Sequence, residues 1–155
     1  MVIFVVGGDG FCGWPSALEL SDEGYDVHII DNLSRRKIDL DIGSDSLTPI
    51  KTIYERVSVW NKISKTPIHF HNINVQSEYD KLLNLFEIYK PNALIHFGEQ
   101  RAAPYSMIGY KEAEYTVRNN IIGTMNLLEC VKEKTPDCHF VHLGTMGVYG
   151  YGVIN

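Results

Sequence analysis

The stretch MVIFVVGGDGFCGWPSALELSDEGYDVHIID, residues 1–31, joins two apolar runs through a glycine-rich turn. The run at 1–6 predicts a fully buried strand, and the glycines within 7–13 predict a tight turn. A helical pattern at 14–23 follows, and a second apolar run, 27–31, ends in an aspartate. Strand, turn, helix, strand and carboxylate therefore come in the order that a dinucleotide-binding site requires.

The glycines and the acid have separate physical tasks in such a site. A bend beneath a bound pyrophosphate needs residues without Cβ, so Gly10 would let the phosphates approach and Gly13 would let the helix pack closely. Free amides at the helix start and the helix dipole favour the negative ligand. Asp31, 21 residues after Gly10, is spaced to accept hydrogen bonds from ribose hydroxyls. The alternatives are an ordinary glycine-rich turn and an acid that merely ends a strand or caps a helix.

NAD is the expected cofactor, because an acid beside the ribose repels the 2′-phosphate of NADP. Arg35 and Arg36 follow soon after Asp31 and weaken that preference, since arginines can receive such a phosphate.

Composition is that of an ordinary globular domain, and we treat residues 1–155 as one domain. Hydrophobic residues make up 45% and charged residues 21%, which argues against disorder. A net charge of −5 gives no support for a nucleic-acid partner, and no apolar run is long enough to span a membrane. Three cysteines without metal-binding spacing predict reduced thiols and a cytoplasmic location.

The rest of the chain continues to alternate strands with helices, which predicts a Rossmann-type α/β fold: a doubly wound parallel sheet with helices on both faces. Apolar patterns predict strands at 68–73, 93–97 and 139–143, and helices at 50–63, 78–89 and 110–134. The long helix carries an apolar stripe made of Val117, Ile121, Met125 and Leu128. The polar stretch from Asn32 to Pro49 predicts an irregular segment, long enough to suggest a function.

His69 and His71 share one face of the strand predicted at 68–73. They could hold a metal ion, but the sequence supplies no clear third ligand. We therefore predict no metal site and expect these histidines to face neighbouring side chains.

Two loops, 98–101 and 144–150, directly follow predicted strands. Ligands of open α/β sheets lie beyond the carboxyl ends of the strands, so both loops should border the same crevice as residues 7–13. Thr145 is placed to hydrogen-bond a substrate hydroxyl, the alternative being a cap on a turn.

The chain resembles the extended short-chain dehydrogenase/reductases that modify nucleotide sugars, and within them the UDP-sulfoquinovose synthases. The stretches that carry the resemblance are GGDGFCGW (7–14), DNLSRR (31–36), DSLTPI (45–50), HFGEQRAAPYSM (96–107), NNIIGT (119–124) and LGTMG (143–147). Those in 96–107 and 143–147 are more discriminating than the glycine turn.

The resemblance implies that UDP-glucose and sulfite are the substrates and that NAD is the cofactor. Oxidation at the sugar C4 would acidify C5, loss of the C6 hydroxyl would follow, sulfite would add at C6, and the hydride would return. Thr145 would be the catalytic residue, holding the C4 hydroxyl over the nicotinamide. Arg101, as a planar fork, suits phosphate or sulfite, the alternative being a salt bridge that holds its loop.

The resemblance also implies the contact residues. The NAD contacts would be Gly7, Gly10, Phe11, Cys12, Gly13, Asp31, Asn32, Arg35, Arg36, Asn72, Ile73, Gly98 and Asn119. The substrate contacts would be Gln100, Arg101, Thr145 and Met146. A homodimer through the helix at 110–134 is expected by analogy.

The sequence departs from the family pattern at three places. No tyrosine is followed four residues later by a lysine, so the acid/base pair of the superfamily is missing. We therefore expect the chain to be the N-terminal NAD-binding part of a longer enzyme and to be inactive alone. Val148 stands where a glutamate is expected, and Asn72 where an acid usually contacts adenine. Met146-Gly147, in place of Asp-Glu, counts against a simple 4,6-dehydratase. A nucleotide-sugar 4-epimerase or dehydratase and a non-catalytic NAD-binding module remain the alternatives.

Overall fold

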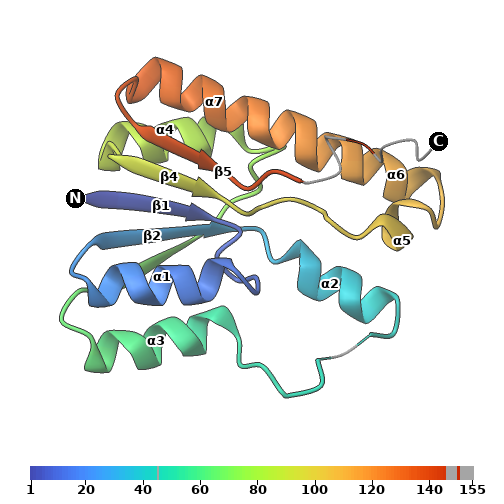
Figure 1. Cartoon of the computed structure of the whole chain (residues 1–155), viewed down its shortest axis with the longest axis horizontal. Coiled ribbons are helices and arrows are strands. Elements are labelled where there is room, and N and C mark those ends of the chain that lie inside the picture. The colour runs from blue at the N-terminus through green and yellow to red at the C-terminus, as the bar shows by residue number, and fades with distance from the viewer. Residues whose placement is uncertain (45, 146–149, 151–155) are drawn as a thin grey trace, which may run out of the picture.

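The computed structural model describes residues 1–44, 46–145 and 150, which form a parallel sheet flanked by helices (Figure 1). Among them the sheet has five strands in the order β3-β2-β1-β4-β5. The strands are β1 Val2–Val6, β2 Asp26–Asp31, β3 Ile68–Asn72, β4 Ala93–His96 and β5 His139–His142. This order is that of a doubly wound dinucleotide-binding sheet, and it confirms the predicted fold class.

The helices form two covering layers and a third group at one end of the sheet (Figure 1). Helices α1 (Gly13–Asp22) and α3 (Ile53–Ile63) cover one face, and α4 (Tyr79–Tyr89) and α7 (Gly123–Lys134) cover the other. Helices α2 (Ser34–Asp41), α5 (Ala103–Ser106) and α6 (Tyr110–Val117) lie beyond the carboxyl ends of the strands. None of the helices in the described part of the chain is both long and apolar enough to cross a bilayer.

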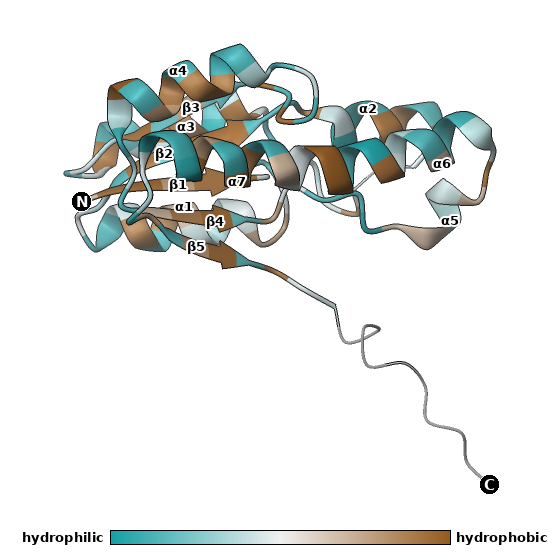
Figure 2. Ribbon diagram, turned by 90° about the horizontal axis from the view of Figure 1, so that it is seen from above, coloured by the Kyte–Doolittle hydropathy of each residue, from teal (hydrophilic) through white to brown (hydrophobic). Residues whose placement is uncertain are grey.

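Both faces of β1 are buried, which explains why its sequence is continuously apolar. Phe4 and Val6 pack toward α4 and α7, whereas Ile3 and Val5 pack toward α1 and α3. In Figure 2, β1 is coloured as hydrophobic along its length. The sheet therefore separates two apolar cores and fixes where each strand ends.

Helix α3 begins three residues later than its apolar pattern suggests. Thr52 caps it, because its side chain accepts a hydrogen bond from the Glu55 amide while the Glu55 side chain binds the Thr52 amide. Ile50, which was expected inside the helix, is exposed ahead of this capping box.

The expectation of an irregular segment after Asn32 was wrong, because it contains α2. This helix has no buried residue, and its sequence SRRKIDLD carries no apolar stripe that a periodicity argument could detect. It follows Leu33, which adopts a left-handed backbone conformation with φ of 58°.

The predicted helix at 110–134 is one helical run interrupted by a π-helical segment, η1 (Arg118–Ile122). Its apolar stripe faces solvent: Val117, Ile121, Met125 and Leu128 are all exposed. The π-helical insertion shifts the register between α6 and α7, and Leu127 and Cys130 of α7 are the residues that face the sheet.

Candidate dinucleotide-binding site

A cleft of about 310 Å³ opens at the carboxyl edge of the sheet. The glycine turn, the end of β2, the loop after β4 and parts of α2, α5 and α6 line it. The structure brings together there most of the residues that the sequence predicted to bind cofactor or substrate. They are Gly7, Gly10, Phe11, Cys12, Gly13, Asp31, Asn32, Arg35, Ile73, Gly98, Gln100, Arg101 and Asn119.

Three glycines of the turn, Gly7, Gly8 and Gly13, are required by the protein itself, since a Cβ on Gly8 would lie 2.4 Å from the buried Ile29 side chain. Gly7 has φ of +80°, and a Cβ there would lie 2.7 Å from the Gly98 nitrogen. A Cβ on Gly13 would lie 2.2 Å from the Gly7 oxygen, so the start of α1 can approach the turn only without a side chain. Gly10 differs, because a Cβ there would meet only the Gly7 oxygen, at 3.2 Å. The space beside Gly10 is thus part of the cleft.

The start of α1 offers unpaired donors to this space. The Gly10 amide donates to the Gly7 carbonyl, and the Trp14 amide donates to the Gly10 carbonyl. Between them, the amides of Phe11 and Cys12 find no acceptor among the described residues. Both residues are exposed and line the cleft. Two amides at the positive end of a helix form an arrangement that binds anions.

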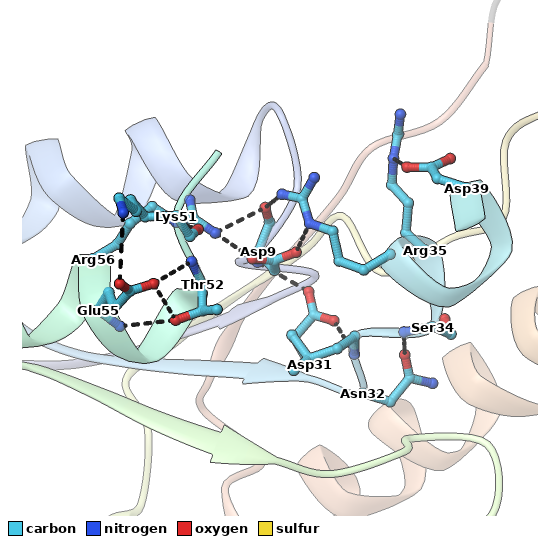
Figure 3. Close-up of polar contacts among 12 residues, drawn as sticks. Asp9, Asp31, Asn32, Ser34, Arg35, Asp39, Lys51, Thr52, Glu55 and Arg56 are labelled. Carbon is cyan, nitrogen blue, oxygen red and sulfur yellow. Dashed lines mark hydrogen bonds and ion pairs between the residues drawn. The ribbon is translucent and has the colours of Figure 1, made fainter. Parts of the chain in front are cut away.

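Asp31 is held in place by two backbone amides (Figure 3). Its Oδ2 accepts from the Asp9 amide at 2.9 Å, and its Oδ1 accepts from the Leu33 amide at 2.8 Å. Burial raises the pKa of Asp31, and the two amide hydrogen bonds oppose that shift. Each carboxylate oxygen has a second lone pair, so Asp31 can accept further hydrogen bonds on the cleft side.

Asp9 is a part of the site that the sequence reasoning missed. It is only 5% exposed, and it forms an ion pair with Arg56 of α3 (Figure 3). It forms a second ion pair with Arg36 of α2, whose Nε lies 2.7 Å from Oδ2. The Arg56 guanidinium also lies 4.5 Å from the centre of the Trp14 ring. Asp9 therefore fastens the glycine turn to two helices. An acid within a glycine-rich turn carries no signal in the sequence that would reveal these partners.

These contacts bear on the expected choice between NAD and NADP. The Nε of Arg36 is bound to the Asp9 carboxylate, and the Nε of Arg35 lies 3.5 Å from Asp39 in an exposed i,i+4 pair. Both arginines that could receive a 2′-phosphate already have carboxylate partners.

The loop after β4 is held by the π-helical segment. Asn119 donates to the Gly98 carbonyl at 3.0 Å, and Asn120 exchanges two hydrogen bonds with the backbone of Gln100, at 2.8 and 2.9 Å. Local π-helical turns often occur at functional sites, and here the turn aims two consecutive asparagines at one loop. Asn119 is among the NAD contacts predicted from the sequence, whereas Asn120 is not.

His96, at the end of β4, is neutral and helps to hold the same loop. Thr124 donates its hydroxyl hydrogen to the Asn120 carbonyl and therefore accepts from His96 Nε2 at 3.0 Å. His96 Nδ1 then accepts from the Gly98 amide at 3.3 Å. Burial, aided by His142, lowers the pKa of His96 to about 4.

The free energy of unfolding should therefore fall at acid pH. The unfolded chain binds a proton at His96 below about pH 6.5, whereas the folded chain does so only near pH 4, so acid favours unfolding across that window. We expect His96 to lower stability by about 2 kcal/mol between pH 7 and pH 5. Urea unfolding at both pH values measures this. The change in the free energy of unfolding between pH 7 and pH 5 should be smaller by that amount in His96→Gln. It should be unchanged in the control His139→Gln, which removes an exposed histidine. An equally reduced pH dependence in both variants would contradict the role given to His96.

The remaining predicted residues lie at the margin of the cleft or outside the described part of the chain. Asn72 ends β3 and is exposed, and Thr145 is exposed two residues beyond Leu143, which lines the cleft. Met146 and Val148 lie outside the described residues. Arg101 is exposed, lines the cleft and forms no salt bridge within residues 1–44, 46–145 and 150.

The strand order, the glycine turn at a helix start and the acid at the end of β2 together define a Rossmann-type dinucleotide-binding fold. The chain belongs to the GDP-mannose 4,6 dehydratase family, whose model matches residues 4–152.

Two similar curated proteins are UDP-sulfoquinovose synthases, which confirms the resemblance seen in the sequence. The chloroplastic enzyme of Spinacia oleracea is 48% identical over 96% of this chain, and that of Sulfolobus acidocaldarius is 43% identical over 97%. The chain spans only 30% and 38% of their respective lengths. Among solved structures, UDP-glucose-4-epimerase from Stenotrophomonas maltophila, with bound NAD and formylated UDP-arabinopyranose, superposes with a TM-score of 0.72 at 23% identity. That match covers 97% of this chain and 38% of the epimerase, and it supports the fold.

Proposed function

We propose that the chain is the NAD-binding part of an enzyme that forms UDP-sulfoquinovose from UDP-glucose and sulfite. The observation that carries this proposal is the 48% and 43% identity to two such synthases across nearly the whole chain. Several UDP-glucose 4-epimerases and related proteins match at about 30% identity, so they support the superfamily rather than this reaction.

The cleft fits NAD at three points. The amides of Phe11 and Cys12 would bind the diphosphate, the space beside Gly10 would admit it, and Asp31 would accept the ribose hydroxyls. Arg36 is paired with Asp9, which leaves Asp31 to favour NAD over NADP. When bound, NAD would supply a hydride acceptor and donor for the sugar C4.

The substrate side of the cleft is the loop after β4. Asn120 forms two hydrogen bonds with the backbone of Gln100, and these fix the backbone position of the neighbouring Arg101. Because Arg101 has no carboxylate partner in the described residues, its guanidinium is available for a diphosphate or for sulfite. Thr145 and Met146 would complete the substrate contacts, with Thr145 holding the C4 hydroxyl.

Asp31→Ala is expected to weaken NAD binding by about 1–3 kcal/mol, the cost of leaving charge-assisted hydrogen bonds unmade. Calorimetric titration of the chain with NAD⁺ measures this. Asp22→Ala, at the far end of α1, is the matched control and should bind like the wild type. Unchanged affinity in Asp31→Ala would remove this carboxylate from the site.

The reaction is tested with a longer protein that contains this sequence and supplies a Tyr-x-x-x-Lys pair. We expect UDP-glucose to give UDP-sulfoquinovose, identified by mass spectrometry, only when sulfite is present. Formation of UDP-galactose regardless of sulfite would replace the proposal with a 4-epimerase. NAD binding without turnover of either kind would favour a non-catalytic module.

We also propose a cytoplasmic location, in keeping with the free cysteines.

We further propose a homodimer through the exposed stripe on α6, η1 and α7. Four apolar side chains at helical spacing leave an unpaired face that a second copy could cover. Ile121→Glu should then convert a dimer to a monomer in sedimentation velocity. Val59→Glu, at an exposed apolar position on α3, is the control and should leave the dimer intact. A monomeric wild type would contradict the dimer.

A further inference from the structure

A second polar cluster lies on β2 and β3, away from the dinucleotide cleft. His28 pairs in register with His69, so these residues and Asp26 and His71, each two positions away along its strand, share one face of the sheet. That face is the one covered by α4, and the Tyr89 ring of α4 lies 4.1 Å from the His28 ring. The sequence revealed only the pair on β3, whereas the parallel pairing adds two residues from β2.

Three of these residues have the spacing of metal ligands. Asp26 Oδ1 lies 3.3 Å from His28 Nε2 and 3.4 Å from His69 Nε2, and one ligand atom from each residue lies within 4.8 Å of the other two. Zinc bonds of about 2.0–2.1 Å in a tetrahedron place neighbouring ligand atoms roughly 3.3 Å apart. The two short distances have that length.

His28 supplies an independent observation, because its Nε2 is buried without a hydrogen bond. The residue is 1% exposed, and although Asp26 lies near Nε2, the geometry of a hydrogen bond is not met. His28 Nδ1 is 2.9 Å from His71 Nε2, so that ring nitrogen has a partner. When Nδ1 donates to His71, Nε2 carries a lone pair directed at the carboxylate, an arrangement that a cation between them would stabilise.

We propose that Asp26, His28 and His69 bind a divalent transition metal ion of the zinc type, with His71 orienting the His28 ring. Imidazole and carboxylate are suitable zinc ligands, and a histidine ligand commonly donates its other N–H to an acceptor. The side chains of Asp26 and His69 are 45% and 46% exposed, so the ion has a path from solvent and room for water as a fourth ligand. Bound metal would tie the edge strand β3 to β2.

Another cluster among the described residues, made of His96, Glu99 and His142, lacks a buried ring nitrogen without a hydrogen bond at His96. Both ring nitrogens of His96 already take part in hydrogen bonds, with Thr124 and with Gly98. A metal there would have to break one of them, so this cluster serves as an internal comparison.

Calorimetric titration of the metal-stripped 155-residue chain with zinc chloride tests the proposal. We expect one site, and we expect His69→Gln and Asp26→Asn each to weaken it about tenfold or more. His142→Gln, which alters the comparison cluster, should bind zinc like the wild type. Both mutated ligands are about half exposed, so these variants should fold, and circular dichroism checks that they do.

Cobalt(II) gives a second readout, because a site of low coordination number with imidazole ligands should produce visible absorption bands that His69→Gln loses. Absence of binding up to about millimolar zinc, equal affinity in wild type and His69→Gln, or loss of binding in His142→Gln would each overturn the proposal.

Discussion

Gly13→Ala is expected to destabilise the chain by about 3 kcal/mol and to abolish NAD binding. The new Cβ would lie 2.2 Å from the Gly7 oxygen and 2.7 Å from the Gly8 Cα, and both are backbone atoms that cannot rotate away. The start of α1 would have to move from the turn, and the amides of Phe11 and Cys12 would move with it. Urea unfolding measures the stability and calorimetry the affinity for NAD⁺.

Two other glycine variants separate the steric effect from a general effect of alanine. Gly144→Ala adds a Cβ that meets no atom within 4 Å and should change stability by less than about 0.5 kcal/mol. Gly10→Ala should be tolerated better than Gly13→Ala in folding yet still weaken NAD binding, since its Cβ would enter the cleft. Gly13→Ala with wild-type stability would contradict the described packing of the turn.

Asp9→Ala is expected to cost about 3–5 kcal/mol of the free energy of unfolding. The change leaves Arg56, whose side chain is 14% exposed, and Arg36 without the carboxylate that both contact. Removing one partner from a buried ion pair leaves uncompensated charge in a poorly hydrated place. The glycine turn would also lose its link to α2 and α3, so the affinity for NAD should fall as well.

Asp39→Ala is the matched control, because it also removes an aspartate that is paired with an arginine of α2. Its partner Arg35 is half exposed, and such a surface pair contributes at most about 1 kcal/mol. Equal losses in the two variants, measured by chemical denaturation, would show that the Asp9 contacts have no special weight.

The sheet and the glycine turn could be predicted because local sequence determines them. β1 is buried on both faces and therefore continuously apolar, and the position of Asp31 follows from the length of one strand-helix-strand unit. The crevice follows in turn, since the carboxyl ends of parallel strands meet at one edge.

Features that depend on contacts between distant segments could not be read in the same way. The partners of Asp9 come from two helices whose sequences give no sign of facing the turn. Helix α2 has no buried residue, so its sequence carries no apolar periodicity from which the helix could be predicted. The four stripe residues on α6, η1 and α7 are exposed, whereas Leu127 and Cys130 of α7 face the sheet, and the apolar pattern did not distinguish the two sets. The cluster around His28 needed the β2–β3 pairing to assemble.

The central claim is that free amides at the start of α1 bind the diphosphate of NAD while Asp31 holds the neighbouring ribose. A titration of the ¹⁵N-labelled chain with NAD⁺, followed by two-dimensional NMR, tests it most directly. We predict that the amide resonances of Phe11 and Cys12, together with that of Leu33 beside Asp31, shift and saturate together. Saturating NAD⁺ that leaves all three resonances in place would contradict the claim.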